Sequence, residues 1–502
     1  MILIDKKKPI DVLFISEGTY PYVKGGVATW ISQLITDIPE LNFGVLFLGS
    51  RRKDYKEIRY NLPENLVYLE TAYFFEEKRS YIPKRRSESE KFHLLKFFLY
   101  KNSQLPGDLF NLNYYYTELQ LETFLDSPEF LKLTEEVYIE LNIEEPFTQF
   151  FWTLKNILTP LLRSIEALKN ILKKKVRLVH SPSTGFAGFL ASLLKTNLKI
   201  PYLLTEHGIY VKERKIDILA STVLEKFSPT FTPEDKYHVD ALKELWIDFF
   251  INLGKASYLT ADVVLSLHEG ARKIQISLGC PPEKTKVIPN GVKVEEFKPL
   301  RRVPKGNIPP VVALIGRVTP IKDVKTFIKA IKILSQKMPN IEGWVVGPTD
   351  ENREYFKECL TLRNLLGLEN KVKFLGLQNI KNILPKVGLT TLTSISEGMP
   401  LVILESFAAG IPSVATNVGF CPQLIYGGLN EEDIKIGKAG EITPIGQPEV
   451  IADTYFQLLT NKEKWLKYRE NAIKRVEKFY TYNVFIDSYK NLYHSFLKLT
   501  GK

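Results

Sequence analysis

Two series of short apolar runs, each rich in β-branched residues, alternate with helix-length segments along the chain. The first series lies at Val12–Ser16, Leu178–His180, Tyr202–Thr205 and Val263–Leu267. The second lies at Val311–Ile315, Glu342–Val346, Val372–Leu375, Leu389–Leu392 and Ser413–Ala415. Strands that alternate with helices form βαβ units, whose strands are parallel and covered by helices. The sequence therefore predicts an α/β protein with one parallel sheet in each half.

The two series meet at a segment with strong turn signals. Ile288–Val292 contains Pro-Asn-Gly, and Pro299–Pro310 is rich in proline. Such residues interrupt helices and strands, so we expect a hinge here. The predicted domains cover residues 1–295 and 296–480, and a final helix over 481–502 is expected to pack back on the N-terminal domain.

A long segment, Thr71–Leu172, separates predicted strands of the first half and is rich in Phe, Tyr, Leu and Lys. Loops of more than about 15 residues without secondary structure are uncommon in compact domains. Because Phe150–Leu172 also shows helical spacing, we expect a helical insertion over about 71–172, with its aromatic residues in core packing.

The formal net charge is +11, from 68 Lys and Arg against 57 Asp and Glu in 502 residues. The basic clusters are short, at Arg51–Lys53, Lys84–Arg86 and Lys173–Lys175. A nucleic-acid binder concentrates its basic residues and carries a binding motif, and this chain shows neither feature. The diluted charge favours a solvated surface, while a phosphate-bearing substrate or an anionic membrane surface stays open.

Cysteine usage and hydropathy indicate the setting of the protein. Cys280, Cys359 and Cys421 are far apart and odd in number, which argues against a disulfide framework or a CxxC metal site. The longest uncharged stretch, between Glu405 and Glu431, is broken by Gly and Pro, and no signal-peptide pattern follows the N-terminus. We therefore expect a cytoplasmic protein without a membrane-spanning helix.

A glycine pair follows the first predicted strand. Gly25 and Gly26 precede a predicted helix that begins near Val27. Glycines at such a turn let backbone N–H groups approach an anion, and the helix dipole favours negative charge there. The pattern is not GxGxxG, so it predicts no dinucleotide site and leaves an anion-binding loop and a plain turn as alternatives.

Two cations follow the first predicted strand of the second half. Arg317 and Lys322 stand directly before a predicted helix that begins near Asp323. Arginine offers a planar fork of donors to phosphate, and lysine offers a point charge. Because doubly wound sheets bind ligands at the carboxyl ends of their strands, this pair predicts a diphosphate site.

Two glutamates flank a Gly-Met-Pro turn in the third candidate region. Glu397 lies in a predicted loop, and Glu405 lies on a predicted helix that begins near Pro400. Free N–H groups at the start of that helix can bind an anion. A carboxylate in the apolar run around Glu405 needs a partner, since burial of an unpaired charge is costly. Sugar or ribose hydroxyls would serve, and a structural salt bridge is the alternative.

Glu397, seven further residues and Glu405 resemble the EX7E motif of glycosyltransferase family 4. The Arg317–Lys322 pair is similar to that family's diphosphate pair, and Pro289–Val292 is similar to its interdomain segment. The resemblance covers nearly the whole chain apart from the insertion. It implies the GT-B fold, with two Rossmann-like doubly wound domains facing a central cleft, and a retaining, nucleotide-sugar-dependent reaction.

Three further stretches resemble the glycosyltransferases of Pel-type exopolysaccharide synthesis. These stretches are Ser16–Trp30, Pro182–Gly188 and Thr205–Tyr210. The resemblance implies a UDP-sugar donor, a polysaccharide acceptor and inner-membrane subunits of the synthesis machinery as partners. It also implies a cytoplasmic protein that could associate peripherally with the inner membrane.

The resemblance assigns roles to residues by matching position. Arg317 and Lys322 would hold the donor diphosphate, and Glu405 would accept hydrogen bonds from the ribose hydroxyls. Glu397 would contact the transferring sugar. The backbone around the Gly-Met-Pro turn would also help to bind the diphosphate. The residues of this segment are Gly398, Met399, Pro400 and Leu401.

The resemblance also places residues of the first half at the site. His207 would be catalytic and border the donor sugar, while Gly25 and Gly26 would lie near the phosphates or the acceptor. Without the resemblance, a histidine beside a strand would be read as a core residue. His180 also follows a predicted strand and could line the same cleft. Lys24 departs from the family pattern, in which glycine is common before the glycine pair.

The chemistry of the reaction argues against one rival function and leaves two others open. Cleavage of a sugar–phosphate bond leaves negative charge on the diphosphate, which cations and helix N-terminal amides can stabilise. No Asp-x-Asp pair occurs in the sequence, so we expect a reaction that requires neither a metal nor another cofactor. A glycosidase dyad would need no diphosphate clamp. A nonhydrolysing nucleotide-sugar epimerase and a nucleotide-sugar-sensing scaffold stay open, and UDP-glucose or UDP-N-acetylhexosamine is the expected donor.

Overall fold

The structure is a computed structural model that describes residues 1–76, 90–220 and 240–499. The basic cluster Lys84–Arg86, part of the predicted insertion and the end of the predicted final helix lie outside the described residues. The contacts divide the chain into two compact units. Unit 1 comprises Met1–Ser266, Arg272–Lys286 and Tyr489–Lys502, and unit 2 comprises Leu267–Ala271 and Val287–Ser488.

Unit 1 is built on an eight-stranded sheet of order β1-β4-β3-β2-β5-β6-β7-β8. The strands are β1 (Ile2–Asp5), β2 (Val12–Glu17), β3 (Phe43–Gly49), β4 (Leu66–Tyr73), β5 (Val179–Ser181), β6 (Tyr202–Glu206), β7 (Val263–Ser266) and β8 (Thr285–Val287). Strands β4, β3, β2, β5, β6 and β7 pair in parallel, and β1 pairs with β4 in antiparallel register. The carboxyl ends of the parallel strands therefore lie along one edge of the sheet.

Helices on unit 1 complete its core. They are α1 (Gly26–Asp37), η1 (Arg52–Asp54), α6 (Phe186–Leu198), α7 (Tyr210–Ala220), α8 (Ala241–Thr260), α9 (Glu269–Ser277) and η7 (Pro282–Lys284). The central strands are almost fully buried; in β2, for example, only Glu17 is not buried. Burial on both faces requires near-continuous apolar runs, which is why such runs mark these strands in the sequence.

Helices also fill the segment between β4 and β5. They are η2 (Glu90–Phe98), η3 (Gly107–Phe110), η4 (Tyr114–Glu118), α2 (Leu121–Phe124), α3 (Pro128–Glu140), α4 (Phe147–Glu166) and α5 (Leu168–Ile171). Helix α4 buries one apolar face that includes Phe150, Leu154, Ile157, Leu161 and Ile165, at helical spacing. This face joins the hydrophobic core of unit 1. The predicted start of the insertion, Thr71, lies inside β4.

Unit 2 is built on a six-stranded, wholly parallel sheet of order β11-β10-β9-β12-β13-β14. The strands are β9 (Val311–Ile315), β10 (Glu342–Val346), β11 (Val372–Gly376), β12 (Leu389–Leu392), β13 (Ser413–Thr416) and β14 (Gly440–Thr443). The confirmed prediction is therefore the α/β class with a parallel sheet in each half, while β1, β3, β4, β8 and β14 were not predicted.

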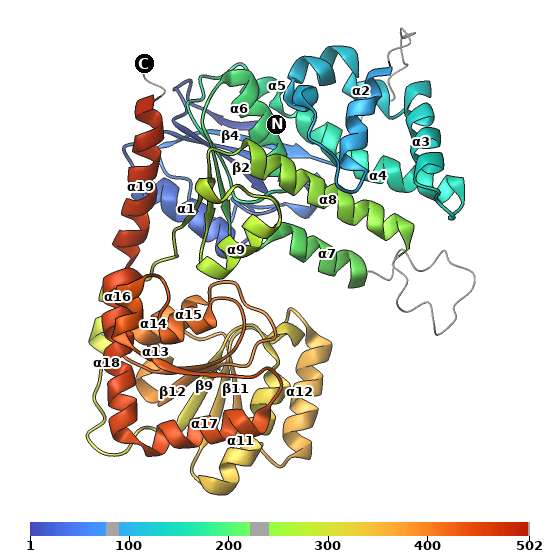
Figure 1. The fold of residues 1–502 in the computed structure, drawn as a ribbon. Helices are drawn as coiled ribbons and strands as arrows, with labels where there is room; N and C mark the ends of the chain where they lie inside the picture. The colour runs from blue at the N-terminus through green and yellow to red at the C-terminus, as the bar shows by residue number, and fades with distance from the viewer. Residues whose placement is uncertain (77–89, 221–239, 500–502) are drawn as a thin grey trace. The chain divides into compact units, whose positions relative to one another are not determined.

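Helices cover both faces of the unit 2 sheet (Figure 1). The regular ones are α10 (Val294–Phe297), α11 (Val324–Lys337), α12 (Arg353–Leu365), α13 (Ile380–Ile383), α14 (Leu401–Ala408), α15 (Cys421–Tyr426), α16 (Glu431–Ile436), α17 (Pro448–Thr460), α18 (Lys462–Phe479) and α19 (Tyr482–Leu499). Short 3₁₀ turns are η8 (Lys298–Leu300), η9 (Pro320–Lys322) and η10 (Leu384–Lys386). Helix α19 begins in unit 2 and ends in unit 1. In the part of the chain that the structure describes, no helix is long and apolar enough to cross a membrane.

Candidate functional site

Two of the predicted site regions, Arg317–Lys322 and Glu397–Glu405, meet at one edge of the unit 2 sheet. After β9 the chain continues to β10 on one side, while β12 pairs with β9 on the other side. The strand order therefore reverses between β9 and β12, and the loops after these two strands lie side by side at their carboxyl ends. Such switch points are where doubly wound sheets bind ligands.

Lys322 and Glu397 form an ion pair between these two loops. The Lys322 Nζ lies 2.5 Å from the Glu397 Oε1, and the two side chains are only 16% and 9% exposed. The Ser394 hydroxyl donates to the same Oε1 at 2.5 Å. The structure thus joins the predicted diphosphate lysine to the predicted catalytic glutamate, and it adds Ser394, which the sequence analysis missed.

Backbone contacts fix the two loops against each other. The Ile395 N–H donates to the Ile321 carbonyl at 2.8 Å. The Thr393 hydroxyl is 3.0 Å from the carbonyl oxygens of both Lys322 and Asp323. Asp323 caps α11, since its carboxylate accepts from the Thr326 N–H at 3.2 Å. The Lys322–Glu397 pair is therefore held by rigid elements.

Arg317 does not share a partner with Lys322 in this structure. Its Nη1 lies 2.6 Å from the Glu351 Oε1, and the two side chains are 56% and 47% exposed. Ion pairs with this exposure contribute little stability, because water screens them. Arg317 can therefore exchange Glu351 for another anion at low cost.

Glu405 lies on α14, the helix that follows the Gly-Met-Pro turn. Pro400 is the N-cap of this helix and no side chain caps it, so its first N–H groups are available. Among the described residues, none hydrogen-bonds to the Glu405 carboxylate, and desolvation raises its pKa to about 7. A largely desolvated carboxylate without a hydrogen-bond partner among the described residues has the environment expected of one that meets a ligand.

The turn before α14 is anchored on both sides. The Met399 sulfur accepts from the Asn290 N–H at 3.2 Å, and Met399 itself is 9% exposed. The Gly398 carbonyl accepts from the Phe420 N–H at 3.1 Å. The His268 ring stacks on Phe420 at 4.9 Å. His268 and Phe420 were both missed, because only the fold brings them to this turn.

Two glycines that the sequence analysis missed shape these loops. A Cβ on Gly419, whose φ is +50°, would lie 1.8 Å from the Glu397 carbonyl oxygen. A Cβ on Gly347, whose φ is +151°, would lie 2.0 Å from the Gly316 carbonyl oxygen. No larger residue fits at these distances. The approach of backbone at Gly419 and Gly347 thus sets the positions of the Glu397 and Arg317 loops.

In unit 1, the glycine pair opens α1 beside unobstructed space. Gly25 is the N-cap of α1, with an extended φ of 175° and no side-chain cap. A Cβ on Gly25 or on Gly26 would contact nothing within 4 Å. The Gly25 N–H donates weakly to the Tyr60 hydroxyl at 3.4 Å. Side chains thus leave space open beside the first turn of α1.

His207 follows β6 and packs against Trp30 of α1, with ring centroids 4.7 Å apart. Its Nε2 is buried and has no hydrogen-bond partner among the described residues. Desolvation lowers the pKa of His207 to about 4, so the imidazole is neutral near pH 7. A neutral ring with an unpartnered nitrogen can bond to a ligand hydroxyl.

His180 does not line a cleft. It is fully buried, and its two ring nitrogens lie 2.9 Å from the Tyr493 hydroxyl and 2.8 Å from the Thr205 hydroxyl. Desolvation lowers its pKa to about 3. Since both nitrogens are occupied inside the core, the expectation that His180 lines the site is wrong.

Two further carboxylates at strand ends of unit 1, the buried Glu206 and the half-buried Glu17, were also missed. Glu206 accepts from the Tyr258 hydroxyl at 2.6 Å and from the Gln275 amide at 3.0 Å. Glu17 accepts from the Tyr210 hydroxyl at 2.7 Å. Desolvation raises the pKa of both carboxyls. Only their positions at strand ends could have pointed to them, because their partners come from distant parts of the sequence.

Solved structures with the same architecture include a glycosyltransferase and a sucrose-phosphate synthase. Anabaena Alr3699/HepE in complex with UDP and glucose aligns with a TM-score of 0.55 and 17% identity, over 96% of this chain and 99% of that one. Sucrose-phosphate synthase from Thermosynechococcus elongatus gives 0.58 and 14%, over 97% and 99%. A glycosyltransferase from Rickettsia africae gives 0.54 and 16%, over 98% and 99%. The fold is therefore that of the GT-B glycosyltransferases.

Family models match both halves of the chain. Residues 10–283, more than half of the chain, match the model described as Domain of unknown function (DUF3492), and the chain belongs to that family. Residues 298–475 match the model described as Glycosyl transferases group 1. These residues contain the whole site of unit 2. No curated protein sequence matches the chain.

Proposed function

We propose that the protein is a retaining glycosyltransferase that transfers a hexose or N-acetylhexosamine from a UDP-sugar to a growing exopolysaccharide. The observation that carries the proposal is the arrangement at the unit 2 switch point. The Lys322–Glu397 pair, the exposed Arg317 and the largely desolvated Glu405 carboxylate lie at one edge of the sheet. The match of residues 298–475 to Glycosyl transferases group 1 supports the same class.

The charges at this edge suit a nucleoside diphosphate. Lys322, Arg317 and the uncapped N–H groups at the start of α14 can together neutralise a diphosphate. Glu405 lies one turn into that helix, where its carboxylate can accept hydrogen bonds from two ribose hydroxyls. Alr3699/HepE has been solved with UDP-glucose bound, which supports UDP-glucose as a first donor to test.

The proposed reaction breaks the bond between the sugar C1 and the β-phosphate oxygen and forms a bond between C1 and an acceptor oxygen. The proton of the acceptor hydroxyl passes to the leaving phosphate oxygen, so that UDP departs on the face that the acceptor attacks. Lys322 and Arg317 would stabilise the charge that builds on the diphosphate. Glu397 would accept hydrogen bonds from the transferring sugar, and the neutral His207 ring would bond to a sugar hydroxyl.

No metal or other cofactor is part of this proposal, since cations of the chain itself are available to the diphosphate. The test is transfer from UDP-glucose and UDP-N-acetylglucosamine after exhaustive EDTA treatment. Undiminished turnover is expected. Activity that EDTA abolishes and Mg²⁺ restores would overturn metal independence but leave the transferase class intact.

The test of the donor site is calorimetric titration with UDP, GDP, ADP and their sugars. UDP compounds are expected to bind most tightly, and Lys322→Ala is expected to reduce kcat/KM about a hundredfold, as loss of one preorganised charge contact typically does. Tighter binding of GDP or ADP than of UDP would overturn the donor assignment. An epimerase would convert the donor without any acceptor, which a donor-only control detects.

We also propose that the protein works in the cytoplasm beside inner-membrane subunits that export the polymer, as the Pel-type resemblance implies. The insertion is the element that such a partner would contact. Residues 90–172 contain more Asp and Glu than Lys and Arg, which favours a protein partner over an anionic lipid surface. Binding of the full chain to anionic liposomes but not to neutral ones would contradict this choice.

A further inference from the structure

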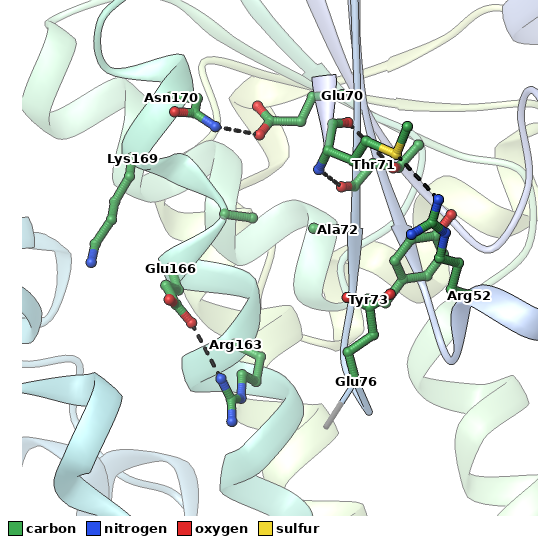
Figure 2. Close-up of a pocket in the computed structure, with 12 residues that line it drawn as sticks. Arg52, Glu70, Thr71, Ala72, Tyr73, Glu76, Arg163, Glu166, Lys169 and Asn170 are labelled. Carbon is green, nitrogen blue, oxygen red and sulfur yellow. Dashed lines mark hydrogen bonds and ion pairs between the residues drawn. The ribbon is translucent and has the colours of Figure 1, made fainter. Parts of the chain in front are cut away.

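A cavity of about 340 Å³ lies in unit 1 where the insertion meets the sheet (Figure 2). The last residues of β4, up to Tyr73, line one side, and the end of α4 with α5 lines the other. Arg52 of η1 lies beside Tyr73 at its margin (Figure 2). We call this cavity the β4 pocket. Its volume lies within the range of small-molecule sites, about 300 to 1,000 Å³.

Charges of both signs line the β4 pocket. Its cations are Arg52, Arg163, Lys169 and the Met1 ammonium, and its carboxylates are Glu70, Glu76 and Glu166. A strongly charged ligand of either sign would meet several like charges. The lining therefore favours a neutral ligand with many hydroxyl groups, such as a saccharide, over a phosphate or a nucleotide.

The guanidinium groups of Arg52 and Arg163 make only long contacts in the pocket. Arg163 is 3.5 Å from the Glu166 carboxylate, a long contact, and the acceptor that Arg52 meets is the Met1 sulfur at 3.6 Å. Sulfur is a weak acceptor, and each guanidinium carries five N–H groups. Several N–H groups of both arginines are thus available to ligand hydroxyls.

Other parts of the lining are rigid. Glu70 is 3% exposed and accepts from the Tyr68 hydroxyl and the Asn170 amide, each at 2.6 Å. The Tyr73 ring packs at 6.1 Å from Tyr55 and 6.3 Å from Phe47. A fixed acceptor with an aromatic wall matches a sugar ring, which presents hydroxyls at its rim and C–H groups on its faces.

The topology relates the β4 pocket to His207. Both lie at carboxyl ends of parallel strands of one sheet, after β4 and after β6. Four strand intervals separate them in the order β4-β3-β2-β5-β6. At about 4.8 Å per interval the separation along the edge is roughly 19 Å. A saccharide of several units can span that length, whereas a single sugar cannot.

From these observations we infer that the β4 pocket is a second saccharide-binding site, which holds the acceptor chain several sugar units away from its reacting end. That the bound saccharide is the acceptor rests on the proposed transferase function. Binding of a neutral oligosaccharide by the pocket does not depend on that function. The site would retain the growing chain between successive transfers.

The experiment measures binding of maltohexaose, cellohexaose, chitohexaose and inorganic pyrophosphate to the full chain by calorimetry and saturation-transfer NMR. Two variants alter the pocket. Ala167→Phe fills it, and Arg163→Gln removes a donor with spare capacity. The matched control is Lys155→Gln, on the same helix and also ion-paired, to Asp126 at 2.9 Å, but outside the pocket lining.

At least one neutral hexasaccharide is expected to bind, at least tenfold more weakly to both pocket variants and equally well to Lys155→Gln. Thermal unfolding identifies any variant that fails to fold, in which case Arg163→Gln decides alone. The inference is overturned if no hexasaccharide binds, if binding survives both variants, or if pyrophosphate is the ligand that Arg163→Gln loses. UDP titration of the same samples tests the donor site separately. Failure of the proposed function can therefore be distinguished from failure of the saccharide-site inference.

Discussion

At the scale of single residues, the Lys322–Glu397 ion pair has a consequence for ligand affinity. A diphosphate that binds Lys322 must displace the Glu397 carboxylate from 2.5 Å. Hydrogen bonds to charged groups contribute about 1.5 to 3 kcal/mol. Glu397→Gln is therefore expected to bind UDP about tenfold more tightly, and sugar transfer is expected to fall because the variant lacks the carboxylate proposed to contact the sugar.

Calorimetric titration with UDP measures this change. The matched control is Glu351→Gln, which frees Arg317 from an exposed ion pair. Exposed pairs contribute about 0 to 1 kcal/mol, so UDP affinity should change less than about fivefold there. Weaker binding of UDP to Glu397→Gln than to the wild type would show that Glu397 holds the site open rather than competing for Lys322.

Glu405 gives a pH dependence at the same scale. Its pKa is raised to about 7 without ligand, and ribose hydroxyls that donate to the carboxylate would lower that pKa. A ligand that lowers a pKa binds the deprotonated form, so affinity should rise with pH through 7. UDP-glucose should bind about tenfold more tightly at pH 8 than at pH 6, with proton release that calorimetry in two buffers detects.

UDP-glucose is the appropriate ligand because its diphosphate is doubly esterified and does not titrate near pH 6. In Glu405→Gln both the pH dependence and the proton release should disappear. Affinity that falls between pH 6 and pH 8 would exclude the carboxylate as the ribose acceptor.

At the scale of loops and strands, Gly419 controls the loop that carries Glu397. Gly419→Ala places a Cβ 1.8 Å from the Glu397 carbonyl oxygen, and this backbone cannot yield without moving the loop. UDP binding is expected to fall by at least tenfold. Gly446→Ala is the control, because Gly446 also has a positive φ, +68°, but nothing lies within 4 Å of its Cβ position.

Gly446→Ala should strain only the left-handed backbone, which lowers folding stability by about 1 to 2 kcal/mol. Its UDP affinity should not change. Thermal unfolding and UDP titration of both variants separate the two effects. Equal losses of UDP affinity in the two variants would mean that the close approach at Gly419 is not what positions Glu397.

The strands and the loops after them show how much of the fold the sequence could predict. Strands β9 and β12 were predicted because both are short runs with β-branched residues, and the loops after them were identified as candidates separately. Their ion pair follows from the pairing of β12 with β9, which no local pattern encodes. Strand β3 is also a fully buried run, but periodicity cannot distinguish such a run from a buried helical segment.

The residues of the candidate site also differ in whether the sequence could predict them. Lys322 and Glu397 stand in motifs with fixed spacing, so sequence reasoning found them. Ser394 and Gly419 matter only through contacts with Glu397. His180 and His207 look alike in sequence, since each follows strand residues, and only the hydrogen bonds that occupy His180 separate the two.

At the scale of the whole molecule, the two units have separate hydrophobic cores, and the end of α19 belongs to unit 1. Tyr489 and Tyr493 of this end are fully buried, and Tyr493 bonds to His180 at 2.9 Å. A chain that stops at Ser488 loses both aromatic side chains from unit 1. Truncation of one buried aromatic residue typically costs about 3 to 5 kcal/mol, so unit 1 should unfold at a much lower temperature.

Unit 2 keeps its core and its donor site in that truncated chain, so UDP should still bind and still raise the unfolding temperature of unit 2. Differential scanning calorimetry with and without UDP measures both transitions. Tyr493→Phe is the graded control, since it removes one hydroxyl, leaves the His180 nitrogen unpaired and should cost only about 1 to 3 kcal/mol. If truncation lowered both transitions equally or abolished UDP binding, the stability of unit 2 would depend on α19 and the two cores would not be independent.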